Sequence, residues 1–146
     1  MHLNLQTIKK LPDAVRIPEY DRDNLSAGII HIGLGNFHRA HMAWYLHRLM
    51  DQGIAHNWAI LGAGVRSLDD VNRTKILEQD CFTTLIKLDP SGKSAEVIGS
   101  MIDYIPVEKN NASLIQHLIK PNIRIVSLTV TEGGYYQTPQ GTLDIQ

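Results

Sequence analysis

The residues best suited to chemistry form a glycine-rich turn at residues 33–39, with glycines at positions 33 and 35. In a dinucleotide-binding turn the first glycine permits a tight bend, and the second lets a pyrophosphate approach the backbone. A helix that follows offers free N–H groups and a positive dipole end to the phosphates. His38 occupies the third position of the motif, where a small residue is usual, so a tight structural turn remains the alternative. Arg39 is placed either to pair with a phosphate or to be solvated.

A carboxylate follows the next predicted strand. NAD-binding domains place an acid roughly 20 residues past the glycines, where it holds the ribose 2′-hydroxyl. Asp69 comes later than this spacing but is the candidate for the role, and it would favour NAD over NADP. Arg66 points the other way, because a guanidinium accommodates a 2′-phosphate, so NADP is not excluded. Asp69 is equally well placed to cap the helix that follows it.

Polar residues also follow the last predicted strand. Thr131 and Glu132 come directly before a Gly-Gly pair. Ligands of open α/β sheets gather beyond the carboxyl ends of the strands, so these two side chains are candidates to touch the nicotinamide or its ribose. A helix cap followed by a glycine turn is the structural alternative.

The histidines and the lone cysteine are further candidate sites. His38 and His41 lie three residues apart, and His47 follows on the same predicted helix, so a metal site is one interpretation. No carboxylate stands at a matching spacing, and a metal would compete with phosphate at the helix start, so we predict no metal site. Cys81 is the only cysteine, which excludes an internal disulfide, and it is predicted to be a buried, inert thiol.

The elements that must position these residues alternate between strand and helix. Strands are predicted at residues 28–32, 58–61, 82–88, 95–98 and 123–130, and helices at 38–50, 69–79 and 111–119. Residues 89–92, Asp-Pro-Ser-Gly, have turn chemistry, so the third and fourth strands should form a β-hairpin. The order predicts an α/β, Rossmann-like, doubly wound and mostly parallel sheet, incomplete at its C-terminus. The hairpin is either an insertion or makes the sheet mixed.

Composition narrows the class of protein. The chain has 146 residues, a net charge of −1 and no basic run longer than Lys9-Lys10, so no nucleic-acid partner is expected. No apolar stretch approaches the roughly 20 residues that span a bilayer, and no secretory signal is evident. We therefore expect a cytoplasmic protein without a membrane partner. Residues 1–28 are predicted to be an irregular arm, and residues 29–146 a truncated NAD(P)-binding Rossmann domain.

Three stretches, residues 30–41, 79–85 and 125–135, resemble the mannitol dehydrogenase family of long-chain polyol and sugar-acid dehydrogenases. The similarity spans about residue 10 to the C-terminus. It implies an N-terminal domain that binds NAD, or in some members NADP, and a hydride transfer without zinc. In the family a lysine of a following helical domain is the general base, so no catalytic residue is expected in this chain. The expected cofactor-binding residues are Ile32, Gly33, Leu34, Gly35, Asn36, Phe37, His38, Arg39, Asp69, Thr131 and Glu132.

The resemblance implies a small polyol or sugar-acid substrate, bound through the C-terminal catalytic domain that this chain lacks. Two other readings stay open. The chain could be a non-catalytic nucleotide-binding fragment that exposes an apolar docking face, or an S-adenosylmethionine-dependent methyltransferase, which also uses a glycine-rich loop after its first strand.

Overall fold

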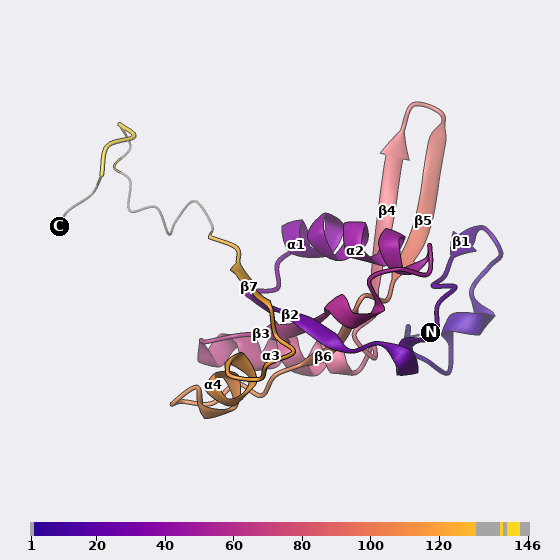
Figure 1. The fold of residues 1–146 in the computed structure, drawn as a ribbon. Coiled ribbons are helices and arrows are strands. Elements are labelled where there is room, and N and C mark those ends of the chain that lie inside the picture. Colours follow the sequence, from indigo (N-terminus) through magenta and orange to yellow (C-terminus); the bar gives the residue numbers. More distant parts are fainter. Residues whose placement is uncertain (1, 131–137, 139, 144–146) are drawn as a thin grey trace.

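A parallel sheet of four strands forms the centre of the molecule (Figure 1). The computed structural model describes residues 2–130, 138 and 140–143. The strands lie in the order β6 (Met101–Tyr104), β3 (Ala59–Ala63), β2 (Ala27–Ile32) and β7 (Ile125–Leu128). The chain thus builds outward from β2 through β3 to β6, then returns to the other side of β2 with β7. This reversal of strand order confirms the doubly wound, Rossmann-like fold.

Helices cover both faces of this sheet. The helices are α1 (Asn36–Ala40), α2 (Met42–Met50), α3 (Ser67–Leu77) and α4 (Ala112–Leu118). Successive side chains of a strand point to opposite faces, so neighbouring residues of β2 enter different cores. Ile29 packs in one core with Met50 of α2 and Ile76 of α3, whereas Ile30 packs in a second core with Leu114 of α4. The glycine turn leaves β2 on the side of α2 and α3.

The predicted hairpin is an insertion with a sheet of its own. Strands β4 (Thr83–Asp89) and β5 (Gly92–Ile98) pair antiparallel, and β1 (Val15–Arg16) adds to β5 in parallel. The hairpin projects beyond the helices, with β1 near its base (Figure 1). The main sheet therefore stays purely parallel. The arm predicted to be irregular contributes β1 and short 3₁₀ turns at Ile8–Lys10 and Arg22–Asn24.

One predicted helix is in fact two. Instead of a single helix over 38–50, α1 begins at Asn36 and α2 ends at Met50, with a break at His41 (φ −119°, ψ −83°). The imidazole Nδ1 of His41 lies 2.9 Å from the carbonyl oxygen of Phe37, the same oxygen that accepts the His41 amide. A side chain that enters the helical hydrogen-bond ladder in this way bends the helix. The break separates the short helix that follows the glycine turn from the longer one that packs on the sheet.

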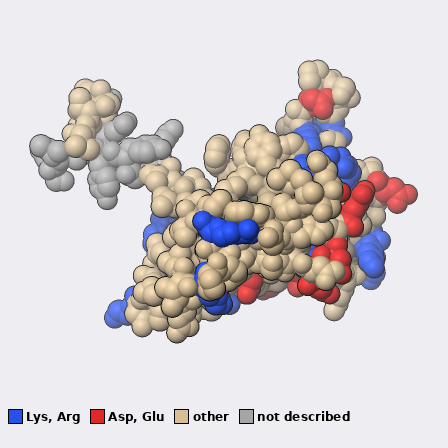
Figure 2. Space-filling view, viewed as in Figure 1, with Lys and Arg blue, Asp and Glu red and all other residues tan. Residues whose placement is uncertain are grey.

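The surface carries both signs of charge. Around the hairpin and the N-terminal arm, basic and acidic groups are interspersed on the face shown in Figure 2. Among the described residues, no helix has both the length and the apolar character to cross a membrane.

Candidate functional site: the glycine turn after β2

Gly33 makes the sharp bend at the end of β2. Its φ is +86°, a left-handed backbone conformation that a residue with a side chain rarely adopts. Its N–H donates to the carbonyl of Ala63, 3.0 Å away on the neighbouring strand β3, and its own carbonyl accepts the N–H of Gly35 at 2.9 Å. The bend is therefore anchored to the central sheet. The fold itself explains the glycine at position 33.

Gly35 has no such internal reason. Its φ of −90° and ψ of 175° are open to any residue, and a Cβ added there would meet no atom within 4 Å. A side chain at this position would instead project into open space in front of the helix start. A glycine here fits the close approach of a ligand to the backbone, as a pyrophosphate makes in dinucleotide-binding turns.

The start of α1 offers unused hydrogen-bond donors. Gly35 is the N-cap and has no side chain to cap the first turn. No described residue accepts the amide N–H groups of Asn36, Phe37 and His38. The Arg39 guanidinium bends back to Asn36, whose Oδ1 accepts from Nη2. Free amides and a guanidinium around an open glycine can bind the oxygens of a diphosphate.

His38, the residue that departs from the usual glycine motif, is buried under this turn. Its ring stacks on that of His31 of β2, with the centroids 3.6 Å apart and the planes at 13°. Burial lowers the pKa of His38 to about 3, and the nearby charges of His31 and Arg39 add to the effect. The ring is therefore neutral at neutral pH. Among the described residues, neither of its nitrogens has a hydrogen-bond partner.

His31 connects this stack to the neighbouring strand β7 and the residue that follows it. Its Nδ1 lies 2.9 Å from Oγ of Ser127, and its Nε2 lies 3.1 Å from Oγ1 of Thr129. Burial lowers the pKa of His31 as well. A neutral imidazole donates from one nitrogen and accepts at the other, so one hydroxyl accepts and the other donates. The glycine turn thus rests on polar contacts between β2 and the segment containing β7.

Asp69 lies in the first turn of α3, at the carboxyl end of β3. Its Oδ2 accepts the N–H groups of Val65 (3.0 Å) and Arg66 (2.9 Å), and its Oδ1 lies 3.3 Å from Nη2 of Arg66. Burial opposes ionisation of this carboxyl, but the hydrogen bonds from Arg66 and Val65 outweigh it, so the pKa of Asp69 is lowered. Asp69 is ionised and caps its own helix. The predicted role of Asp69 as a helix cap is thus present in the structure. A ribose would share this carboxylate with Arg66.

The other predicted residues of the turn lie in different environments. Ile32 ends β2 and is half-buried, and the Leu34 side chain lies directly over Gly62 of β3. Phe37 is 67% exposed, and its ring stacks on that of His41 with the centroids 4.4 Å apart. Residues 32–39 and Asp69 therefore come together at the carboxyl ends of β2 and β3. Thr131 and Glu132 lie outside the described residues.

The three histidines of the metal hypothesis do not converge. His38 is stacked on His31, His41 is exposed, and His47 lies with Asp51 and Glu96, with potential ligand atoms within 4.8 Å of one another. Two cations already neutralise these carboxylates. Arg48 Nη1 lies 3.2 Å from Glu96 and 3.6 Å from Asp51, and Lys87 Nζ lies 3.0 Å from Glu96. We interpret the cluster as an ion-pair network between α2 and the hairpin.

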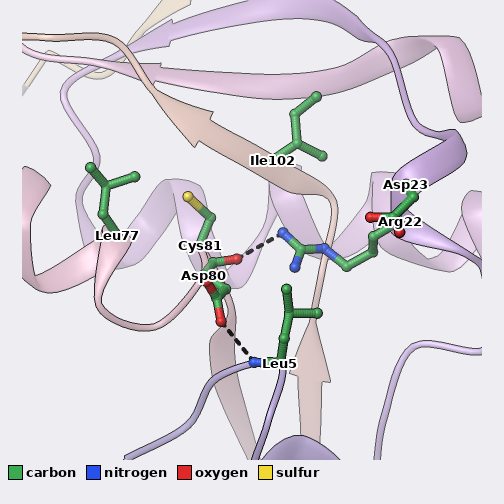
Figure 3. A pocket seen from close by; sticks show the side chains of 7 residues that line it. All are labelled: Leu5, Arg22, Asp23, Leu77, Asp80, Cys81 and Ile102. Atoms are coloured by element: carbon green, nitrogen blue, oxygen red, sulfur yellow. Dashed lines mark hydrogen bonds between the residues drawn. The ribbon is translucent and has the colours of Figure 1, made fainter.

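A separate cavity of about 210 Å³ lies between the N-terminal arm, the end of α3 and β6 (Figure 3). The Arg22 guanidinium at its edge donates hydrogen bonds to the backbone carbonyls of Asp80, Gly99 and Met101. Asp80 accepts the Leu5 amide at 2.7 Å, which ties the arm to the body. Cys81 is buried as predicted, and burial raises the pKa of its thiol to about 12. Arg22 and Asp80 therefore use their polar groups in this cavity to hold the fold together.

Two groupings of residues near the turn were not predicted. One is the hydrogen-bonded set of His31, Ser127 and Thr129 beneath the turn, which are far apart in the sequence. The second consists of residues that line a cavity between the turn and α3, among them Asn72, Lys75 and Gln79. The second group had a signal in the sequence, because Asn72 and Lys75 follow Asp69 at three-residue steps and so share one face of α3, and Gln79 comes just after the helix ends.

Comparison with known proteins agrees with this geometry. A family model described as the mannitol dehydrogenase Rossmann domain matches residues 27–144. A mannitol 2-dehydrogenase of Cereibacter sphaeroides is 53% identical over 131 residues, which cover 90% of this chain and 28% of that protein. A polyol:NADP oxidoreductase of Gluconobacter oxydans is 41% identical over 89% of this chain and 27% of its own length.

Among solved structures, the Pseudomonas fluorescens mannitol 2-dehydrogenase in a ternary complex with NAD and D-mannitol matches with a TM-score of 0.86 and 42% identity. The match covers 98% of this chain and 30% of that one. The chain thus spans less than a third of the length of the relatives it matches.

Proposed function

Since the chain belongs to the mannitol dehydrogenase family, we propose that it is the cofactor-binding portion of an NAD-dependent polyol or sugar-acid dehydrogenase. The observation that carries the proposal is Gly35, a glycine that neither backbone strain nor packing requires, placed before free amides at a helix start. The similar mannitol 2-dehydrogenase from Pseudomonas fluorescens was solved in complex with NAD, which supports NAD as the cofactor.

The residues around the turn divide the work of binding. The amides of Asn36, Phe37 and His38 would donate to the diphosphate, and the Arg39 guanidinium would offset its charge. Asp69, with its remaining lone pairs, would accept from the adenosine ribose. We further propose that Thr131 and Glu132 contact the nicotinamide or its ribose.

The proposed reaction is hydride transfer between a secondary alcohol of the substrate and the cofactor. Bound nicotinamide supplies the hydride acceptor, so the protein contributes binding, orientation and electrostatics. In this chain those contributions come from the turn after β2, and we assign none of its residues as the general base. A small polyol or sugar acid is the proposed substrate of the whole enzyme.

An NADH fluorescence titration of the chain and of Gly35→Val tests the proposal. We expect saturable binding that the variant loses, while its thermal unfolding temperature stays within a few degrees, because the backbone at 35 suits any residue. Gly33→Val is the matched contrast, since its φ of +86° should make that variant unfold at a lower temperature. Equal NADH affinity in wild type and Gly35→Val would refute a cofactor on this turn. Binding of S-adenosylmethionine instead of NADH would favour the methyltransferase reading.

A further inference from the structure

Phe37 and His41 form an exposed aromatic pair beside the glycine turn. The Phe37 side chain is 67% exposed, and His41 is exposed as well. Their rings stack with the centroids 4.4 Å apart and the planes at 23°. The His41 ring is held in turn by its Nδ1, which lies 2.9 Å from the carbonyl oxygen of Phe37. A large apolar ring is thus fixed in place with most of its surface in solvent.

The geometry of α1 determines the side of the helix on which the Phe37 ring lies. Successive side chains of an α-helix point about 100° apart. The His38 ring packs on His31 of the sheet, and Arg39 lines the cavity between the turn and α3. Phe37, which comes two residues before Arg39, therefore points to the side of α1 that lies away from α3.

The side away from α3 is the side of β7. The sheet places β3 and β7 on opposite sides of β2, and α3 follows β3. At the start of α2, Sδ of Met42 lies 3.8 Å from Oγ of Ser127, so this part of the helix lies against β7. A Cβ added to Gly33 would lie 3.8 Å from the carbonyl oxygen of Thr129, the residue that follows β7. The aromatic pair therefore borders the half of the turn that faces β7.

This half of the turn is where the nicotinamide of a bound dinucleotide would lie. In doubly wound sheets the dinucleotide binds across the point where the strand order reverses, with its diphosphate at the helix start. In this chain that point lies between β2 and β7. The adenosine half is proposed at Asp69, beyond β3, so the nicotinamide half extends towards β7 and the ring of Phe37. A nicotinamide ring is flat and, when oxidised, positively charged, and both properties suit the face of a phenylalanine ring.

We propose that the Phe37 ring, supported from behind by His41, is the surface on which the nicotinamide ring of the cofactor stacks. The proposal rests on the cofactor site at the glycine turn, and it gives the side chain of Phe37 a role separate from that of its backbone amide. Stacking covers one face of the nicotinamide and leaves the other to the substrate. Phe37 is therefore a positioning residue that selects the face on which hydride is exchanged.

The test compares NADH with ADP-ribose, which has the same adenosine and diphosphate but no nicotinamide. We expect Phe37→Ala to weaken NADH binding about tenfold, through the loss of an aromatic stack and its buried area, and to leave ADP-ribose binding within about twofold. Phe37→Trp should retain NADH binding because it keeps an aromatic face. Tyr45→Ala removes an exposed ring of α2 further from the turn and should change neither affinity.

The fluorescence of bound NADH gives a second measurement, because the nicotinamide ring is the fluorophore. We expect its emission maximum to move towards that of free NADH in Phe37→Ala and to stay at the wild-type position in Tyr45→Ala. Unchanged ADP-ribose binding also shows that Phe37→Ala is folded and that its diphosphate site is intact.

Each other outcome overturns a defined statement. Equal losses of NADH and ADP-ribose binding in Phe37→Ala would show that this side chain supports the diphosphate turn and does not contact the nicotinamide. Unchanged NADH binding in Phe37→Ala, or an equal loss in Tyr45→Ala, would also refute the stacking role and leave the cofactor site standing. Binding of neither NADH nor ADP-ribose by wild type would refute the proposed function itself.

Discussion

Replacing Glu96 by Gln should destabilise the chain in a pH-dependent way. The Glu96 side chain is 4% exposed and sits at the centre of the network between α2 and the hairpin. It accepts from Trp44 Nε1 at 2.8 Å, and it pairs with Arg48 at 3.2 Å and with Lys87 at 3.0 Å. Burial alone would raise the pKa of this carboxyl, but the hydrogen bonds and charges of Trp44, Lys87 and His47 lower it from 4.5 to about 2.

The magnitude follows from the shift. A pKa lowered from 4.5 to about 2 corresponds to about 3 kcal/mol of stability above pH 4.5. This stability is present above the unfolded pKa and is lost as the pH falls through the folded pKa. Glutamine keeps the shape and loses the charge, so Glu96→Gln should lower the free energy of unfolding by about 2 to 3 kcal/mol at pH 7. For a chain of this size that is a decrease of roughly 5 to 10 °C in Tm.

Urea unfolding at pH 7 and near pH 3 measures the effect. The difference between wild type and Glu96→Gln should shrink steadily as the pH falls from 4.5 towards 2. Glu19→Gln, at an exposed position of the N-terminal arm, is the matched control and should change stability little at either pH. A constant difference at both pH values would show that the carboxylate charge does not stabilise the hairpin, and would refute the reasoning.

Two further predictions concern the core and the turn. Cys81 should resist alkylation in the native chain and react in denaturant, because a pKa raised from 9.0 to about 12 lowers the thiolate fraction roughly 1,000-fold; equal rates would contradict its burial. Gly62→Ala should cost about 1 to 3 kcal/mol, since its Cβ would lie 2.4 Å from Leu34 Cδ1 and 3.1 Å from a ring carbon of Tyr104. The variant should also bind NADH more weakly, because the new methyl group displaces Leu34. An unchanged unfolding temperature and an unchanged NADH affinity would show that Leu34 can move aside without cost.

The sequence predicts the elements whose pattern is local. The strands at β2 and β3 are apolar runs that end at glycines, and the hairpin turn is encoded by Pro90 and Gly92, so each could be recognised within a few residues. The strand β6 was missed because it is four residues long and contains Asp103. The two-residue strand β1 exists only through its pairing with β5, which no local pattern specifies.

The candidate site also has a part that is local in sequence and a part that is not. The glycine turn is contiguous in sequence, so residues 33–39 could be assigned to one site without a structure. The support beneath it is not contiguous, because His31 contacts Ser127 and Thr129, 96 and 98 residues away in the chain. In the sequence, His38 therefore only departs from the small residue that is usual at the third position of the motif. The structure shows that its ring stacks on the buried ring of His31.

This support bears on how the turn would bind a diphosphate. The turn is held by the Gly33 amide on the carbonyl of Ala63, by Leu34 over Gly62, and by the stack of His38 on His31. All three contacts join the turn to strands of the parallel sheet, so the turn has its shape before a ligand binds. Binding therefore costs little conformational entropy for ordering the turn. Because the His38 ring is neutral, it adds no charge to the site. The attraction for a diphosphate must then come from the free amides of α1 and from Arg39, which is why a side chain at position 35 should abolish binding while leaving the fold intact.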